Sequence, residues 1–153
     1  MARLYDTDFT AWADKTAQLL AKRRFEAVDL DALIEEVEGL GISQRREYRS
    51  YLLRIIEHLL KWTYAPASIF ARNERGWRLS INNPRRAIAA LLEDNASAAC
   101  DRNKALASAY RQALGSVRDE CDDFGPVQWP ETCPWTIAQV LDEAFFPARE
   151  ANG

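Results

Sequence analysis

The stretch that decides the fold is SQRREYRSYLLRIIEHLLKWTY, residues 43–64, in the middle of the chain. Its apolar side chains recur at intervals of three and four residues, which is the spacing of one face of an α-helix. The stripe that they form is wide, as in a helix at the centre of a bundle. Its members are Tyr48, Leu52, Ile55, Ile56, Leu59, Leu60 and Thr63. The sequence therefore predicts a central helix that ends before Pro66.

Helical spacing continues on the N-terminal side of this segment. A first helix is expected after Asp6, whose side chain can accept from a free backbone N–H of the first turn. A second helix is expected to begin after Asp29 and to stop near Gly39 and Gly41, because glycine allows the left-handed backbone of a helix end. The apolar positions that indicate these two helices are Phe9, Trp12, Ala13, Thr16, Leu19 and Leu20, then Leu30, Leu33, Ile34 and Val37.

Two rules conflict at the proline of the fourth segment. The pair Asn83-Pro84 is typical of the start of a helix. The apolar residues around it nevertheless keep one continuous helical spacing: Trp77, Ile81, Pro84, Ile88 and Leu91. We predict one helix from about Arg75 to Asp94, kinked at Pro84, because a new helix would keep this phase only by accident.

The remaining chain is expected to form a fifth helix, a loop and a last helix. The fifth helix is predicted from about Ser97 to Cys121. Residues 122–135 hold three prolines and two tryptophans without periodicity, which predicts an ordered loop pinned to the bundle by its tryptophans. The last helix has a capping box at Thr136 and Gln139. Pro147 is expected to end the ordered chain.

Length and composition agree with a folded helical protein. The chain has 153 residues, of which 48% are hydrophobic and 28% charged, and this balance excludes an intrinsically disordered chain. No segment alternates polar and apolar residues as a β-strand does. The sequence thus predicts the all-α class: a compact bundle of about six helices in a single domain over residues 1–153, with an ordered core of about 4–147.

Several features indicate a soluble protein of the cytoplasm. No long apolar run follows the N-terminus, so no signal peptide is expected, and no segment reaches the roughly 20 apolar residues of a membrane span. The cysteines Cys100, Cys121 and Cys133 are odd in number and lack a CxxC pair, which suits free thiols in a reducing compartment. We expect no membrane contact, no metal and no cofactor.

Seven short blocks, in order along the chain, carry a resemblance to a known family. They are LYDTDFTAW at 4–12, DLDALIEEVEGLG at 29–41, SQRRE at 43–47, HLLKWTY at 58–64, RGW at 75–77, LLEDN at 91–95 and CPWTIAQVLDE at 133–143. Together they resemble the bacterial family known as domain of unknown function 29. The resemblance implies a bacterial, helical, soluble protein and brings no assigned activity, cofactor or catalytic residue. Pro84 departs from the family, whose typical members we expect to lack a proline in that helix.

The single histidine, His58, restricts the enzyme chemistry that the chain can perform. A di-iron bundle site needs a Glu-x-x-His pair on each of two helices, and a serine or cysteine nucleophile needs a neighbouring base. No Gly-x-Ser-x-Gly, phosphate-binding glycine loop or His-Glu-x-x-His motif occurs. His58 falls at the border of the apolar stripe, where a packed or capping role is expected, and its ring should pack on Trp62 one turn later.

A carboxylate enzyme is the remaining catalytic interpretation. It would use Glu35, Glu38 and His58 with a divalent ion for hydrolysis, and it requires these groups to converge in one pocket. Lys61 and Trp62 would complete that pocket. The alternative is that the glutamates form a solvated face or pair with arginines.

The net charge of −3 conceals a basic central third. Residues 1–41 carry a net charge of −4, residues 42–95 of +5 and residues 96–153 of −4. Five arginines lie in or near the predicted fourth helix, on the side away from its apolar stripe. They are Arg72, Arg75, Arg78, Arg85 and Arg86. Arg72 could still belong to the loop before the helix. These arginines either pair with the acidic helices or form a surface that binds an anion or a partner.

The sequence favours a non-enzymatic protein-interaction or regulatory module, which docks another protein or a second copy of itself. Five tryptophans, five tyrosines and six phenylalanines support this hypothesis, because aromatic residues and arginine often anchor interfaces. Binding of nucleic acid or another anion through the arginines of residues 72–86 is the alternative. A carboxylate- or metal-dependent hydrolase is a third hypothesis.

Overall fold

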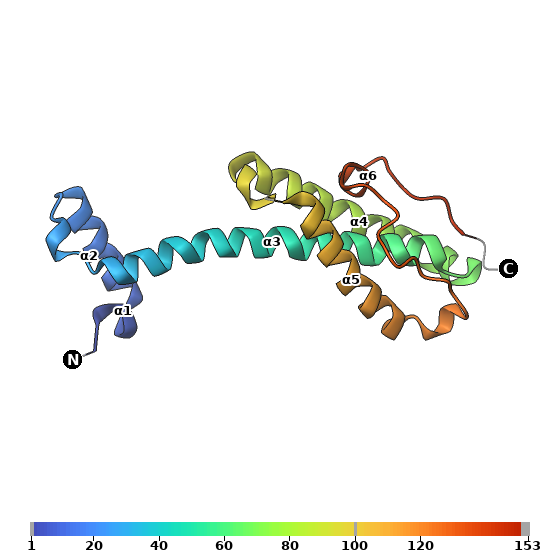
Figure 1. Ribbon diagram of the computed structural model, residues 1–153, viewed down its shortest axis with the longest axis horizontal. Coiled ribbons are helices and arrows are strands. Elements are labelled where there is room, and N and C mark those ends of the chain that lie inside the picture. The colour runs from blue at the N-terminus through green and yellow to red at the C-terminus, as the bar shows by residue number, and fades with distance from the viewer. Residues whose placement is uncertain (1, 100, 151–153) are drawn as a thin grey trace. The chain divides into compact units, whose positions relative to one another are not determined.

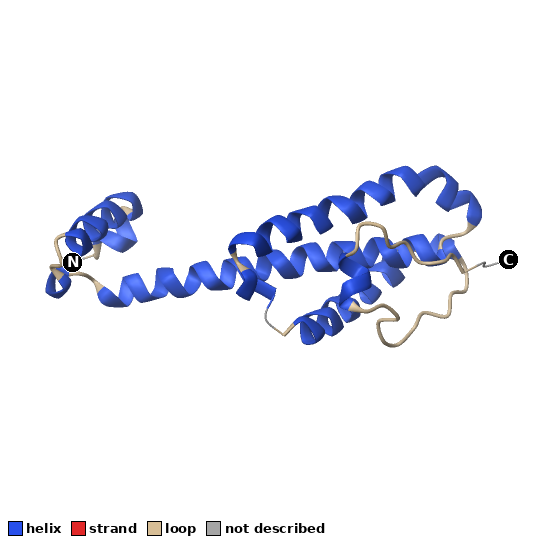
Figure 2. Cartoon of the chain, turned by 90° about the horizontal axis from the view of Figure 1, so that it is seen from above, coloured by secondary structure: helices blue, strands red, loops and turns tan. Residues whose placement is uncertain are grey.

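Helices and loops make up the whole of the described chain (Figures 1 and 2). The computed structural model describes residues 2–99 and 101–150, and no strand occurs in them. The α-helices are α1 (Leu4–Thr7), α2 (Phe9–Ala21), α3 (Leu30–Tyr64), α4 (Ala67–Asp94), α5 (Arg102–Glu120) and α6 (Ile137–Leu141). Three 3₁₀ helices, η1 (Phe25–Ala27), η2 (Ala96–Ala99) and η3 (Asp122–Phe124), lie between them. The predicted all-α class and the number of about six helices are confirmed.

Two compact units follow each other along the chain, Met1–Ser43 and Gln44–Gly153. The first contains α1, α2, η1 and the beginning of α3, and the second contains the rest. The single domain expected over residues 1–153, with its ordered core of about 4–147, stays a prediction. In the described residues, no helix combines the length and the apolar character that crossing a membrane would require.

The N-terminal unit is held together by a small core around Trp12. The Trp12 indole is buried and meets the ring of Tyr5 edge-on, with 4.8 Å between the ring centroids. Asp29 caps α3 as predicted, because its carboxylate accepts from the backbone N–H of Ala32 at 3.2 Å. The cap of α2 was assigned to the wrong residue: Asp8, and not Asp6, accepts from an N–H of the first turn.

The helix end predicted near Gly39 and Gly41 does not occur. α3 runs without interruption from Leu30 to Tyr64, so the expected second and third helices are one. Among the described glycines, Gly125 alone has a positive φ. A glycine inside a helix costs only about 1 kcal/mol relative to alanine, and no proline follows to stop the i→i−4 hydrogen bonds.

The core of the C-terminal unit is built on the second half of α3. All seven residues of the predicted stripe are buried, which confirms this helix as the central one. They face buried residues of α4, α5 and the following segment, among them Ile81, Ile88, Leu106, Tyr110, Val117, Phe124, Trp135 and Val140. Figure 1 shows α4 running beside this half of α3 and α5 crossing it.

The continuous helix through Pro84 is confirmed. Pro84 is buried inside α4, and α4 begins at Ala67, directly after Pro66, and not near Arg75. The kink at Pro84 stays a prediction. α5 is shorter than predicted because η2 and the segment before Asp101 take up its expected first turn. Cys100 lies outside the described residues.

The loop between α5 and α6 is pinned to the bundle, as its tryptophans predicted. Trp135 is buried, and the ring of Trp129 lies edge-on to Tyr64, with 5.1 Å between the centroids. The hydroxyl of Tyr110 donates to the carbonyl of Pro130 at 2.6 Å. The capping box of α6 is confirmed, since Thr136 and Gln139 each accept the other's backbone N–H.

The C-terminal segment remains bonded beyond Pro147, where we expected the ordered chain to end. The backbone N–H of Glu150 donates to the Thr63 carbonyl at 2.9 Å, and the Arg149 guanidinium donates to the Ala65 carbonyl at 2.6 Å. These two bonds satisfy the carbonyl of Thr63, which has no partner within the last turn of α3, and that of Ala65 directly after the helix. Residues 151–153 lie outside the described residues.

The uninterrupted α3 predicts opposite effects of alanine at two glycines. Gly39→Ala should raise the free energy of unfolding by about 0.5–1 kcal/mol, because alanine favours the helix and its Cβ would have no atom within 4 Å. Gly125→Ala should lower it, because φ is +73° there. Urea unfolding followed by circular dichroism measures both effects. A loss of stability in Gly39→Ala would mean that the helix ends near this glycine.

Candidate functional site

Arg85, predicted to point away from the core, is buried with only 2% of its surface exposed. Its Nε donates to the Val140 carbonyl at 2.7 Å, and Nη2 donates to the Gln139 carbonyl at 3.4 Å. Nη1 donates to the side chain of Asn82 at 3.1 Å. Burial lowers the pKa of Arg85 to about 10. The prediction was wrong because α6 covers this side of α4, and helical periodicity within α4 carries no information about that cover.

Two further arginines of the predicted set interact with other side chains of the C-terminal unit. Arg78 pairs with Glu74 at 3.3 Å and lies over the rings of Trp62 and Phe146, at 5.0 and 4.5 Å from their centroids. Arg86 forms an ion pair with Glu143, just beyond α6. Cation–π contacts and ion pairs of this kind hold α4 against the C-terminal segment.

Arg72 and Arg75 are exposed, as Arg78 and Arg86 also are. Arg72 belongs to α4 and not to a preceding loop. Neither Arg72 nor Arg75 has an ion pair within the described part of the chain. Of the five arginines, Arg78, Arg85 and Arg86 have partners within the C-terminal unit, and the role of the five as one binding surface stays a prediction.

His58 is packed and bonded to its own helix. Its Nδ1 lies 2.8 Å from the Arg54 carbonyl, so Nδ1 carries the proton and donates. Burial lowers the pKa of His58, and the positive charges of Lys61 and Arg54 lower it further, against the opposing effects of the Arg54 carbonyl and Glu120. The imidazole is thus held in its neutral form.

The other members of the predicted pocket lie in different surroundings. Lys61 forms an ion pair with Glu120 of α5 at 3.0 Å. Trp62 packs on Phe70 and Phe146, with ring centroids 4.8 and 4.7 Å away, and its expected packing with His58 stays a prediction. Among the described residues, no group of three or more His, Cys, Asp or Glu side chains could hold a metal ion.

The glutamates proposed for that pocket belong to the N-terminal unit. Glu35 and Glu38 are both exposed on α3. Their neighbour Glu36 is half-buried, and it accepts from the Tyr5 hydroxyl at 2.6 Å. This bond raises the pKa of Tyr5 to about 12, so the phenol stays protonated. Glu36 thus joins α1 to α3.

An exposed apolar stripe runs along the first half of α3. Leu30, Ile34 and Val37, spaced four and three residues apart, are 53%, 54% and 59% exposed. Leu40 and Ile42, farther along α3, are also more than half exposed. The sequence pattern predicted that Leu30, Ile34 and Val37 share a face. It held no signal that this face would stay open, because cover depends on segments distant in the sequence.

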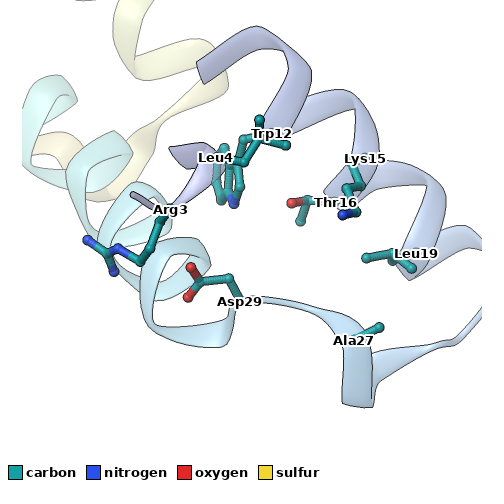
Figure 3. A pocket seen from close by; sticks show the side chains of 8 residues that line it. All are labelled: Arg3, Leu4, Trp12, Lys15, Thr16, Leu19, Ala27 and Asp29. Atoms are coloured by element: carbon teal, nitrogen blue, oxygen red, sulfur yellow. The ribbon is translucent and has the colours of Figure 1, made fainter. Parts of the chain in front are cut away.

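A hollow of about 220 Å³ opens in the N-terminal unit between α1, α2 and the start of α3 (Figure 3). Leu4, Trp12, Thr16, Leu19 and Asp29 are among the residues that line it. The indole N–H of Trp12 is buried and has no hydrogen-bond partner. The lining mixes apolar groups with the charged side chains of Arg3, Lys15 and Asp29.

These features define an all-α protein whose C-terminal segment is bonded back onto a central helix and which carries an exposed apolar stripe. The chain belongs to the family described as domain of unknown function DUF29, whose model matches residues 4–146. The resemblance of the seven sequence blocks is thereby confirmed. No curated protein and no solved structure matches the chain.

Arg85 and Arg75 form a matched pair for testing the burial of the arginines. Arg85→Met should lower the free energy of unfolding by about 2–4 kcal/mol, because it leaves the Val140 and Gln139 carbonyls without their donor. Arg75→Met, on the exposed part of the same helix, should change it by less than about 0.5 kcal/mol. Urea unfolding measures both, and equal effects would contradict the buried role.

The lowered pKa of His58 predicts a pH-dependent stability. Below about pH 6.5, the ordinary pKa of histidine, the unfolded chain binds a proton that the folded chain resists. The free energy of unfolding should therefore fall as the pH drops through 6.5 and level off at the lower folded pKa. Urea unfolding between about pH 7.5 and 5.5 measures this slope. His58→Gln should flatten it, since His58 is the only histidine; an unchanged slope would contradict this origin.

Proposed function

We propose that this chain is a non-enzymatic protein-interaction module that docks a partner on the apolar stripe of its N-terminal unit. The carrying observation is the exposure of Leu30, Ile34 and Val37, each more than half open on one face of α3. Single exposed apolar residues are ordinary, whereas a contiguous exposed patch is typical of an interaction surface. A regulatory role in the bacterial cytoplasm goes with this proposal, and the free thiols of Cys121 and Cys133 support a reducing compartment.

Charge around the stripe indicates the chemistry of the partner. Asp31, Glu35 and Glu38 lie beside the stripe on exposed positions of α3, and none has an ion pair within the described residues. The first 41 residues carry a net charge of −4. A second copy would bring like charges together, so the partner that fits is an amphipathic helix with Lys or Arg beside its apolar face.

The competing functions have less support. Nucleic-acid binding through residues 72–86 loses Arg78, Arg85 and Arg86 to internal contacts. The hydrolase hypothesis needs Glu35, Glu38 and His58 in one pocket, and the glutamates are exposed while the imidazole bonds to its own helix. Neither competing function has an observation comparable to the exposed stripe.

A synthetic amphipathic peptide tests the docking surface directly. A fluorescent 18-residue helix of leucine and lysine should bind the full chain, and a version with glutamate in place of lysine should not. Ile34→Ser should weaken binding about tenfold, the loss expected from one buried isoleucine. Fluorescence anisotropy measures the affinities.

Leu79→Ser is the matched control, because Leu79 of α4 is as exposed as Ile34 but lies in the C-terminal unit. Its affinity should equal that of the unchanged chain. Equal weakening in both variants, or equal binding of the two peptides, would refute a specific docking stripe. A dimer that Ile34→Ser dissolves would assign the stripe to a second copy and overturn the basic partner.

A further inference from the structure

A basic hollow of about 390 Å³ opens in the C-terminal unit between α3 and α5. Arg49 enters it from α3. The other lining residues belong to α5 and its cap: Asp101, Lys104, Ala105, Ser108 and Arg111. Lys104, Ser108 and Arg111 are spaced four and three residues apart, so they share one face of α5. Ala105, which is buried, joins them beside the core.

None of the three cations that line this hollow, Arg49, Lys104 and Arg111, is neutralised by an ion pair in the described part of the chain. One carboxylate, that of Asp101, shares the hollow. Its Oδ1 accepts from the backbone N–H of Lys104 at 3.2 Å and caps α5. Three cations against one carboxylate leave a formal surplus of two positive charges.

A doubly charged tetrahedral anion fits this arrangement. A phosphate monoester carries a charge of about −1.5 to −2 near neutral pH and three strong acceptor oxygens. Two guanidinium groups, an ammonium group and the Ser108 hydroxyl line the hollow from two different helices, so they offer at least one donor for each of the three phosphate oxygens. A single carboxylate would satisfy only half of the surplus charge. The hollow also has the volume of a site for a small organic ligand, at about 300–1,000 Å³.

We propose that this hollow binds the phosphate group of a small phosphate monoester, held by Arg49 of α3 and by Lys104, Ser108 and Arg111 of α5. This site is separate from the apolar stripe and does not depend on the docking function. It also differs from the arginines of residues 72–86, because three cations from two helices line one hollow with a single carboxylate. The side chain of Asp101 already accepts from a backbone N–H at the N-terminus of α5, so the phosphate would be bound by side chains and not by the end of the helix.

An NMR titration of the full chain tests the proposal. Inorganic phosphate and phenyl phosphate, added at constant ionic strength, should shift the backbone amides of residues 104–111 in a saturable way, and chloride should not. Lys104→Gln and Arg111→Gln should each weaken binding about tenfold, as expected for the loss of one charge-assisted hydrogen bond. Both side chains are exposed, so both variants should keep the circular dichroism of the unchanged chain.

Arg118→Gln is the matched control, since it removes one exposed positive charge from the same helix outside the hollow. It should weaken phosphate binding less than twofold. Equal weakening by Arg118→Gln and Lys104→Gln would overturn the site, because the effect would then be one of net charge. Shifts that chloride reproduces, or binding of an oligonucleotide without binding of either phosphate probe, would overturn it as well.

Discussion

The burial of one face of α3 is the constraint on which the C-terminal unit depends. Residues such as Leu52, Ile56 and Leu59 are wholly removed from water, and α4, α5 and the segment after α5 supply the surfaces that cover them. Apolar burial is the dominant favourable contribution to folding, so the positions of the covering segments follow from it. The polar contacts then adapt to this packing: Arg149 and Glu150 satisfy carbonyls at the end of α3 because the C-terminal segment already lies there.

The return of the C-terminal segment also changes the role of the arginines on α4. Arg85 lies under α6 and donates to two of its carbonyls, while Arg78 lies over the ring of Phe146. Basic residues that a helical projection assigns to one outward face thus divide into structural and exposed ones. The positive charge that stays unpaired around a hollow lies instead between α3 and α5, at Arg49 and Lys104.

α3 carries two kinds of apolar surface along a single helix. Its second half is buried, whereas Leu30, Ile34 and Val37 in the first half are open. In the N-terminal unit, Trp12 and Ala32 are among the buried core residues, whereas the stripe is not covered. An exposed stripe costs solubility without adding stability, which is the physical reason to assign it a partner.

Local chemistry in the sequence determined the helical class, the central stripe, the continuous helix through Pro84 and the capping box of Thr136 and Gln139. Each of these depends on residues within a few turns of one another, so spacing and residue type are sufficient to predict them. Only the tertiary structure decided that α3 continues through Gly39 and that Arg85 is buried. It also decided that a basic hollow opens around Lys104. A glycine permits a helix end without requiring one, and a helix face is buried only where a distant segment covers it. Periodicity identifies such a face, and only the folded chain determines what lies against it.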